Sequence, residues 1–355
     1  MRRSLFKLIF ALPLVFAALV SAHAATAPAS SPSSTQSIMD AMTKANAAVV
    51  GVKVSAVKGA RSAQTLGANR SGSGVVIGPD GLILTIGYLM LEAQQIEIVT
   101  QEGKTLPAVA VAYDLATGFG LIRPLLPMRG VAPVALGSQQ DLKPGEALMA
   151  ATGVNDGDEG GVSMTQLVSQ RAFSGTWEYH LDSALFTSPP VSSAGRSGVG
   201  NHSGAPLFNR KGELMGIGSL FVVDAIGQNT RNPGNMFVPI DLLKPILAEM
   251  QQLGSSRQSA RAWLGVTSSD QGGRVQVMRV AEGSPADEAG LKPGSVVQAI
   301  DGVPVTTLEA FYKKLWARGT PEQPVKLTIR EGDQVKTVDI KPQNRMLSLK
   351  KPAGI

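Results

Sequence analysis

The chain has 355 residues, of which 43% are hydrophobic and 17% are charged, which is typical of a globular protein with two or three domains. Its net charge of +6 is too weak to indicate binding to nucleic acid. The lack of cysteine excludes disulfides, thiolate metal sites and cysteine nucleophiles, and three histidines are too few for a His-rich metal site. We therefore expect no metal and no cofactor.

Residues 1–24 have the pattern of a signal peptide. A basic start precedes an apolar stretch at residues 8–20, and Ala22-His23-Ala24 matches an A-x-A cleavage site. The apolar stretch is short for a membrane span. We expect cleavage after Ala24, a mature protein without a transmembrane segment, and a periplasmic or secreted location. Residues 25–36 are small, polar and proline-bearing, which predicts a flexible segment.

Residues 37–254 alternate between short apolar runs and turn signals. The clearest case is the strand at 75–77, the Gly78-Pro79-Asp80-Gly81 turn and the return strand at 82–85. Further strands are expected at 48–56, 96–100, 108–112, 121–122, 132–136, 147–151, 214–218 and 235–239, and helices at 38–47 and 241–253. Short strands at this spacing predict an all-β barrel or sandwich.

A second unit follows a polar linker at residues 255–261. Residues 262–344 carry strands at 274–280, 296–300, 325–330 and 335–340, with helices at 284–289 and 308–317. This order predicts a compact α+β module. Residues 345–355 are expected to form a loose tail.

Ser203 lies in a glycine-rich turn, between Gly200 and Asn209, that leads into an apolar run. A serine nucleophile needs small neighbours, so that a carbonyl can approach, and backbone N–H groups that face the developing oxyanion. On this stretch alone, an ordinary loop between two strands is the better explanation of these residues. The choice depends on whether the chain supplies a base.

Four motifs, taken in order, resemble the HtrA (Deg) family of serine proteases. They are SGSGVVIGPDGLILT at 71–85, the serine loop with APLFNRKGELMGIG, the stretch NMFVPIDLLKPILAEMQQLG, and the C-terminal module. The resemblance spans roughly residues 37–344 and implies a mainly β fold. It implies a trypsin-like double β-barrel over 37–254, followed by one α+β PDZ domain over 262–344.

The resemblance also implies where catalytic residues belong. The family has a histidine in L-T-x-x-H-V-V, an aspartate in T-D-L-A-V-L and a serine in G-N-S-G-G-P-L, and the matching positions here are Tyr88, Gly118 and Ser203. Asn201 stands in the oxyanion loop where the family has glycine, and Asp114 matches a non-catalytic position. Because serine needs an adjacent base and a tyrosine has an ordinary pKa of about 10, these departures predict a catalytically impaired homologue.

Two histidines could supply a different base. His202 is the sequence neighbour of Ser203, so its side chain should point away, and His180 could fold back from a loop. An active serine endopeptidase that uses Ser203 with an unrecognised base is therefore the alternative function.

The C-terminal module predicts peptide binding. Trp263-Leu264-Gly265-Val266 resembles the carboxylate-binding loop of HtrA-type PDZ domains. The resemblance implies that backbone N–H groups there hold a terminal carboxylate, while the following strand pairs with the peptide. Phe311 and Leu315 either line the apolar pocket or pack in the core.

The expected partners are therefore polypeptide ligands or unfolded proteins, for an adaptor, a scaffold or a component of envelope protein quality control. The chain's own apolar end, Ala353-Gly354-Ile355, is a further candidate for the groove. Family members commonly form trimers through aromatic N-terminal contacts, and residues 25–50 contain no aromatic residue. The sequence leaves homo-oligomer formation open.

Overall fold

The computed structural model describes residues 34–155, 159–191, 202–227, 230–270 and 272–350. The predicted signal peptide, most of the predicted flexible segment and the last residues of the tail lie outside this part. Helix α1 (Ser34–Asn46) begins before the end of the segment expected to be flexible, and a side-chain hydrogen bond from Gln36 to Asp40 (2.8 Å) supports its first turn.

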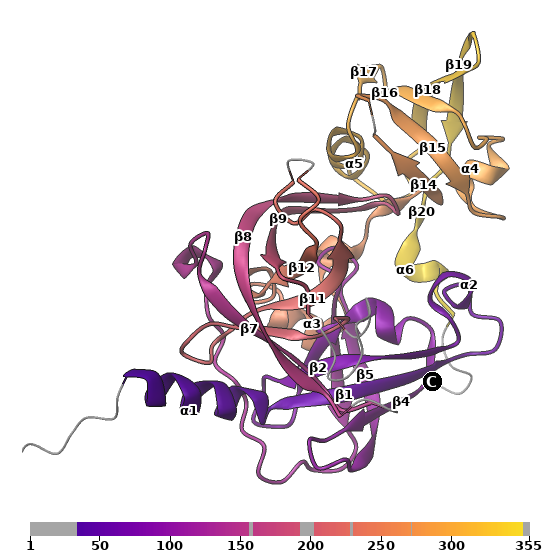
Figure 1. Cartoon of the computed structure of the whole chain (residues 1–355). Helices are drawn as coiled ribbons and strands as arrows, with labels where there is room; N and C mark the ends of the chain where they lie inside the picture. The colour runs from indigo at the N-terminus through magenta and orange to yellow at the C-terminus, as the bar shows by residue number, and fades with distance from the viewer. Residues whose placement is uncertain (1–33, 156–158, 192–201, 228–229, 271, 351–355) are drawn as a thin grey trace, which may run out of the picture.

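Two closed antiparallel barrels make up the first two-thirds of the fold (Figure 1). The strand order of the first is β1 (Val49–Ala56), β2 (Asn69–Val76), β3 (Ile83–Ile86), β6 (Phe119–Pro124), β5 (Thr105–Tyr113) and β4 (Ala93–Val99). The order of the second is β10 (Pro206–Phe208), β11 (Leu214–Val222), β12 (Gly234–Pro239), β9 (Tyr179–Ser188), β8 (Gly161–Gly175) and β7 (Ala147–Thr152). Closure leaves neither barrel with an unpaired edge strand.

One hydrophobic cluster spans both barrels, and the second barrel has a further cluster of its own that includes Leu207 and Phe237. Buried side chains of the first barrel, such as Phe119, belong to the same cluster as Phe208 and Ile217 of the second. The cluster therefore fixes the two barrels side by side, and the loops between them are held from both sides.

The predicted helix at 241–253 is interrupted. A short turn η3 (Ile240–Leu242) precedes α3 (Leu247–Leu253), which ends at Gly254 as expected. Pro245 lies between them and lacks the N–H that a continuous helix would use. Asp241 instead accepts a hydrogen bond from the N–H of Gln139 (2.5 Å).

An open sheet forms most of the C-terminal domain, which lies beyond the tip of the β8–β9 hairpin in Figure 1. Its order is β14 (Val266–Ser269), β15 (Val275–Val280), β16 (Val296–Ile300), β18 (Val325–Glu331) and β19 (Gln334–Ile340), and β17 (Val303–Pro304) pairs with β16. Helices α4 (Pro285–Glu288) and α5 (Leu308–Trp316) pack with this sheet around one core, and β13 (Ala262–Trp263) pairs with β20 (Gln343–Asn344).

The described part of the C-terminal tail is not loose. Helix α6 (Arg345–Ser348) leads back toward the first barrel, where the backbone N–H of Lys350 donates to the carboxylate of Glu92 (3.0 Å). Glu92 is buried, so it needs hydrogen-bond donors, and the tail supplies one of them. The sequence pattern of the tail carries no sign of this distant partner.

The linker is also held in place. The buried carboxylate of Asp114 accepts hydrogen bonds from the hydroxyls of Ser256 and Ser259, both 2.5 Å. The short turns η4 (Arg257–Ser259), α2 (Ala63–Leu66), η1 (Gly87–Met90) and η2 (Gln139–Asp141) complete the elements.

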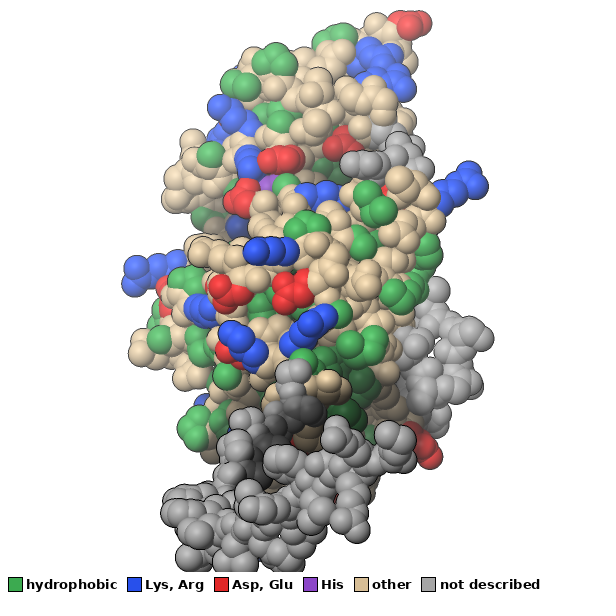
Figure 2. Space-filling model, turned by 60° about the vertical axis from the view of Figure 1, so that its left-hand side comes forward, with side chains coloured by type: hydrophobic (Ala, Val, Ile, Leu, Met, Phe, Trp, Pro, Cys, Tyr) green, Lys and Arg blue, Asp and Glu red, His purple; other side chains and the backbone are tan. Residues whose placement is uncertain are grey.

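None of the described helices has the length and hydrophobicity that a bilayer crossing requires. On the face drawn in Figure 2, acidic, basic and hydrophobic side chains are mixed.

Candidate functional site

Ser203 lies in a turn that both barrels hold. Its carbonyl accepts the N–H of Ser73 (2.8 Å) from the first barrel, and the next N–H, that of Gly204, donates to the carbonyl of Gly218 (2.8 Å) in the second. Gly204 has φ +76°, and a Cβ there would lie 2.0 Å from the Ser73 carbonyl oxygen. Only glycine fits this close approach, so the glycine after Ser203 is a requirement of the turn.

Tyr88 is the side chain that contacts Ser203. Its Oη lies 2.6 Å from Ser203 Oγ and 2.8 Å from the carbonyl oxygen of Ser219. A phenol has one proton and a carbonyl can only accept. Both contacts are satisfied together when Tyr88 donates to Ser219 and Ser203 donates to Tyr88.

The protonation of Tyr88 decides what this contact can do. Burial raises the pKa of Tyr88 to about 12, and the hydrogen bond with Ser203 opposes this shift only in part. At neutral pH the phenol is therefore uncharged. A neutral phenol oxygen accepts a hydrogen bond but does not take the proton of a serine hydroxyl, so the pair lacks a general base.

A buried arginine fixes the turn that carries Tyr88. Tyr88 lies on η1, and Arg70 donates through one guanidinium nitrogen to the carbonyls of Tyr88 (3.1 Å) and Leu91 (2.7 Å). Its other terminal nitrogen donates to the hydroxyl of Ser62 (2.7 Å). Carbonyls at the end of a helical turn have no partner within the turn, and Arg70 supplies one.

Gly118 cannot easily carry a side chain. Its φ is +84°, and a Cβ there would lie 3.1 Å from the hydroxyl of Tyr179, which donates to the carbonyl of Thr117 (2.6 Å). An aspartate at this position would meet both backbone strain and the tyrosine.

The nearby carboxylate of Asp114 is already engaged. It accepts from the N–H (2.8 Å) and hydroxyl (2.6 Å) of Thr117, besides the two linker serines. These hydrogen bonds hold the loop at residues 114–117 and the linker together.

Neither candidate histidine reaches Ser203 through a hydrogen bond within the described residues. His180 lies on β9 rather than in a loop, because its backbone pairs with Ser174 on β8. Its Nδ1 is 2.9 Å from Ser174 Oγ and its Nε2 is 3.2 Å from Asp182, so both nitrogens are occupied. His202 is half-buried, and burial lowers its pKa. Asn201 lies outside the described residues.

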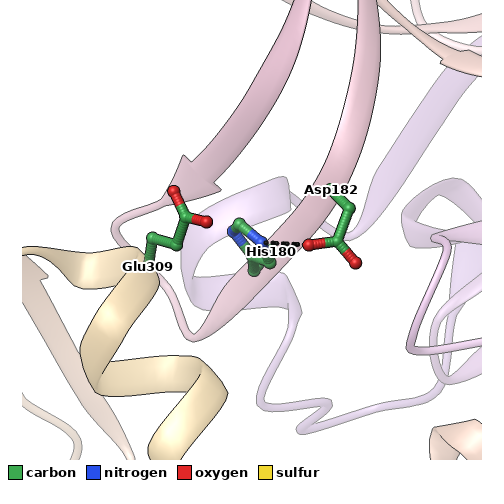
Figure 3. Close-up of side chains that lie close together, drawn as sticks. All are labelled: His180, Asp182 and Glu309. Carbon is green, nitrogen blue, oxygen red and sulfur yellow. Dashed lines mark hydrogen bonds and ion pairs between the residues drawn. The ribbon is translucent and has the colours of Figure 1, made fainter.

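His180 and Asp182 also lie close to Glu309 of helix α5, as Figure 3 shows. Their ligand atoms are within 4.8 Å of one another, a spacing that a metal ion could bridge. Lys313 already places its ammonium 2.7 Å from a carboxylate oxygen of Asp182 and 2.7 Å from one of Glu309. The ammonium group of Lys313 therefore joins Asp182 on β9 to Glu309 on α5.

A second site lies at the predicted carboxylate-binding loop, residues 264–266, where the structure places a carboxylate. The backbone N–H groups of Leu264 and Gly265 donate to the two oxygens of Glu178, at 2.7 and 2.9 Å. The N–H of Val266 makes a third hydrogen bond, at 3.2 Å. Glu178 is buried, and burial raises its pKa to about 7, although the three N–H donors and the charge of Arg345 oppose this shift.

The backbone around Glu178 lies against both β14 and α5. The N–H of Ser268 on β14 donates to the carbonyl of Thr176 (2.8 Å). The hydroxyl of Tyr312 on α5 donates to the carbonyl of Gly175 (2.8 Å) and accepts from the N–H of Glu178 (3.2 Å). Residues 175–178, which we call the hairpin tip, join β8 to β9.

The structure separates the predicted peptide-binding residues into two groups. Leu264, Gly265 and Val266 present the N–H groups, while Phe311 and Leu315 are fully buried in the core of the C-terminal domain. Trp263 lies on β13 beside the loop. Glu178 and Tyr312 were not predicted, because no local pattern shows that a barrel hairpin reaches this domain.

Comparisons with known proteins agree with these two parts. A family model for a trypsin-like peptidase domain matches residues 72–217, and one for a PDZ domain matches residues 262–341. The chain is 26% identical over 294 residues to serine protease HTRA1 of Xenopus tropicalis, covering 77% of this chain and 60% of that protein. It is 28% identical over 285 residues to a probable periplasmic serine endoprotease DegP-like of Hahella chejuensis, covering 76% of this chain and 56% of that protein. The chain thus spans about 60% of the length of these relatives.

Solved structures show the same architecture. An HtrA-type protease AlgW with tripeptide matches with a TM-score of 0.52 at 18% identity, over 89% of this chain and 98% of that one. The serine endoprotease from Yersinia pestis matches with a TM-score of 0.50 at 20% identity, over 86% and 97%. The predicted fold class, a mainly β trypsin-like double barrel followed by a PDZ domain, is confirmed.

Proposed function

This chain has the HtrA/DegP-type combination of a trypsin-like serine protease domain and a C-terminal PDZ domain, and we propose that it is a catalytically impaired member that binds peptides. The ligands are exposed or C-terminal segments of other polypeptides, held by the PDZ domain. In this role the protein is an adaptor or scaffold, or a component of envelope protein quality control.

The observation that carries the impairment is the Tyr88–Ser203 contact. Tyr88 lies where a base would have to lie, 2.6 Å from Ser203 Oγ, and its pKa of about 12 keeps it protonated at neutral pH. Gly118 offers no carboxylate that could orient a base. In serine proteases that lose triad members, the remaining acceleration over water is roughly 10³–10⁴-fold, from the oxyanion hole and binding.

A fluorophosphonate probe tests the impairment. We expect the full chain at pH 7 to show no more labelling than its Ser203→Ala variant, because the Ser203 hydroxyl has no group that can take its proton. Mass spectrometry of the labelled peptide would locate any adduct. An adduct on Ser203 that disappears in Ser203→Ala would overturn the proposal and favour the active endopeptidase.

The cellular location of the protein is also part of this proposal. The Hahella chejuensis relative carries the word periplasmic in its name, and residues 1–24 have the pattern of an export signal. We propose export with cleavage after Ala24. N-terminal sequencing of the protein recovered from a secreting host checks this, and an intact Met1 would contradict it.

A further inference from the structure

We propose that the hairpin tip, residues 175–178, is a built-in ligand of the PDZ domain, so that an external peptide C-terminus binds only after it displaces Glu178. This inference rests on the proposed peptide-binding function. It adds the chemistry of the competitor, a side-chain carboxylate from the protease domain of the same chain.

The first argument for this proposal is the set of hydrogen bonds at residues 264–266. Three consecutive N–H groups converge on the two oxygens of one carboxylate, at 2.7, 2.9 and 3.2 Å. A peptide's terminal carboxylate has the same two oxygens, and above pH 7, where Glu178 is ionised, the same charge, so it would use the same donors. Because the donors are already paired, the loop holds either Glu178 or a peptide end, and not both.

The second argument is the path of the hairpin tip's backbone along strand β14. A peptide in such a groove would pair its backbone with the edge strand β14. Here the N–H of Ser268 on that strand already donates to Thr176, two residues before Glu178. The tip thus occupies the strand edge as well as the carboxylate loop.

Helix α5 completes the enclosure of the tip. Tyr312 is fully buried, and its hydroxyl bonds to the backbone on both sides of the turn, at Gly175 and Glu178. Figure 1 shows the β8–β9 hairpin extending from the second barrel to this domain. The local backbone is adapted to the contact, because Glu178 adopts φ +60°, a conformation that few residues other than glycine adopt.

Displacement of the tip must break the buried hydrogen bonds of Glu178 and Tyr312, while the neighbouring link between β9 and α5 is weaker. Around the tip, β9 and α5 are joined by the ion pair of Lys313 with Asp182, whose side chains are 49% and 80% exposed, and exposed pairs stabilise little. An internal ligand lowers the apparent affinity of an external one by the fraction of molecules in which the groove is open. Loss of the charge-assisted hydrogen bonds of Glu178 should therefore raise peptide affinity on the order of 10- to 100-fold.

The test uses the full chain and two sets of decapeptides. Both sets have randomised apolar residues at the last three positions, one with a free terminal carboxylate and one amidated. We expect Glu178→Gln and Glu178→Ala to bind the free-carboxylate set on the order of 10- to 100-fold more tightly than the wild type, by fluorescence anisotropy. Glu288→Gln, an exposed glutamate on α4, is the matched control and should bind as the wild type does.

Hydrogen exchange gives a readout that needs no peptide. The amides of residues 264–266 should be protected in the wild type and should exchange faster in Glu178→Ala, because the variant removes their acceptor. Equal exchange in both proteins would overturn the docked tip, as would equal peptide affinity in both. Failure of Glu178→Ala to bind any free-carboxylate peptide, with its loop amides exposed, would instead overturn the proposed peptide-binding function and the displacement with it.

Discussion

The Ser203 turn and the carboxylate loop of the PDZ domain are both occupied, but in opposite ways. At Ser203 the neighbouring position is filled by Tyr88, whose Oη lies 2.6 Å from the serine Oγ and whose pKa is raised by burial. At residues 264–266 the donors keep their recognition chemistry and hold a carboxylate that belongs to the same chain. In the first region a side chain contacts the serine hydroxyl, whereas in the second three backbone N–H groups bind a side chain from the other domain of the same chain.

The largest expected effect comes from giving Ser203 a base. Tyr88→His should raise fluorophosphonate labelling at pH 7.5 to about 10²-fold above the Ser203→Ala background, the lower end of what a positioned base contributes. Labelling rates for the wild type, the variant and the variant combined with Ser203→Ala measure this. No increase in Tyr88→His would indicate that the turn, and not only the base, is unsuited to catalysis.

A second substitution sharpens the same point. Adding Gly118→Asp to Tyr88→His should raise the labelling rate little further, since φ +84° and the Tyr179 hydroxyl oppose a side chain at residue 118. Adding Tyr179→Phe as well removes the nearest atom, and the triple variant should label faster than the double variant. The reverse order would mean that Tyr179 is not the obstacle.

The charge of Glu178 predicts the next effect. In the folded protein its pKa is about 7, against 4.5 for an ordinary glutamate, so the unfolded chain releases the proton first as pH rises. The free energy of unfolding should therefore fall by up to ~3 kcal/mol as pH rises from about 4.5 to about 7. Above pH 7 the titration of Glu178 should cause no further change.

Urea unfolding at pH 5 and pH 8 checks this dependence. Glu178→Gln cannot titrate, so its stability should lack this decrease, while Glu288→Gln should retain it. If Glu178→Gln keeps the full slope, other groups cause the pH dependence and Glu178 is ionised in the docked state.

The two regions also differ in how far the sequence predicted them. Ser203, Tyr88 and Gly118 stand in motifs that are continuous along the chain, so their neighbourhood could be placed by resemblance. Many strands followed from short apolar runs between turns, but the strand expected at 132–136 is only an isolated bridge at Leu136, and the long strands β8 and β9 were not predicted. Residues 264–266 were found by resemblance as well.

Contacts between distant segments were beyond that reasoning. In the sequence Glu178 is one acidic residue between Trp177 and Tyr179, and nothing there shows that the hairpin reaches the PDZ domain, 86 residues further along the chain at Leu264. The contact of Lys350 with Glu92 has the same character, with the partners 258 positions apart in the chain. Such contacts depend on the direction of a hairpin and on the position of a linker, which local propensity does not encode.

The smallest expected effect concerns the ion pair beside the hairpin tip, and it distinguishes the contribution of this pair from that of Glu178. Lys313 contacts Asp182 on β9 and Glu309 on its own helix, and its side chain is 49% exposed, so solvent and salt weaken both pairs. Lys313→Ala should therefore change the affinity for free-carboxylate peptides by less than about threefold, far below the effect of Glu178→Ala. A Lys313→Ala effect as large as that of Glu178→Ala would place the closing interaction at the ion pair on β9, and the carboxylate in the loop would then be a consequence of docking and not its cause.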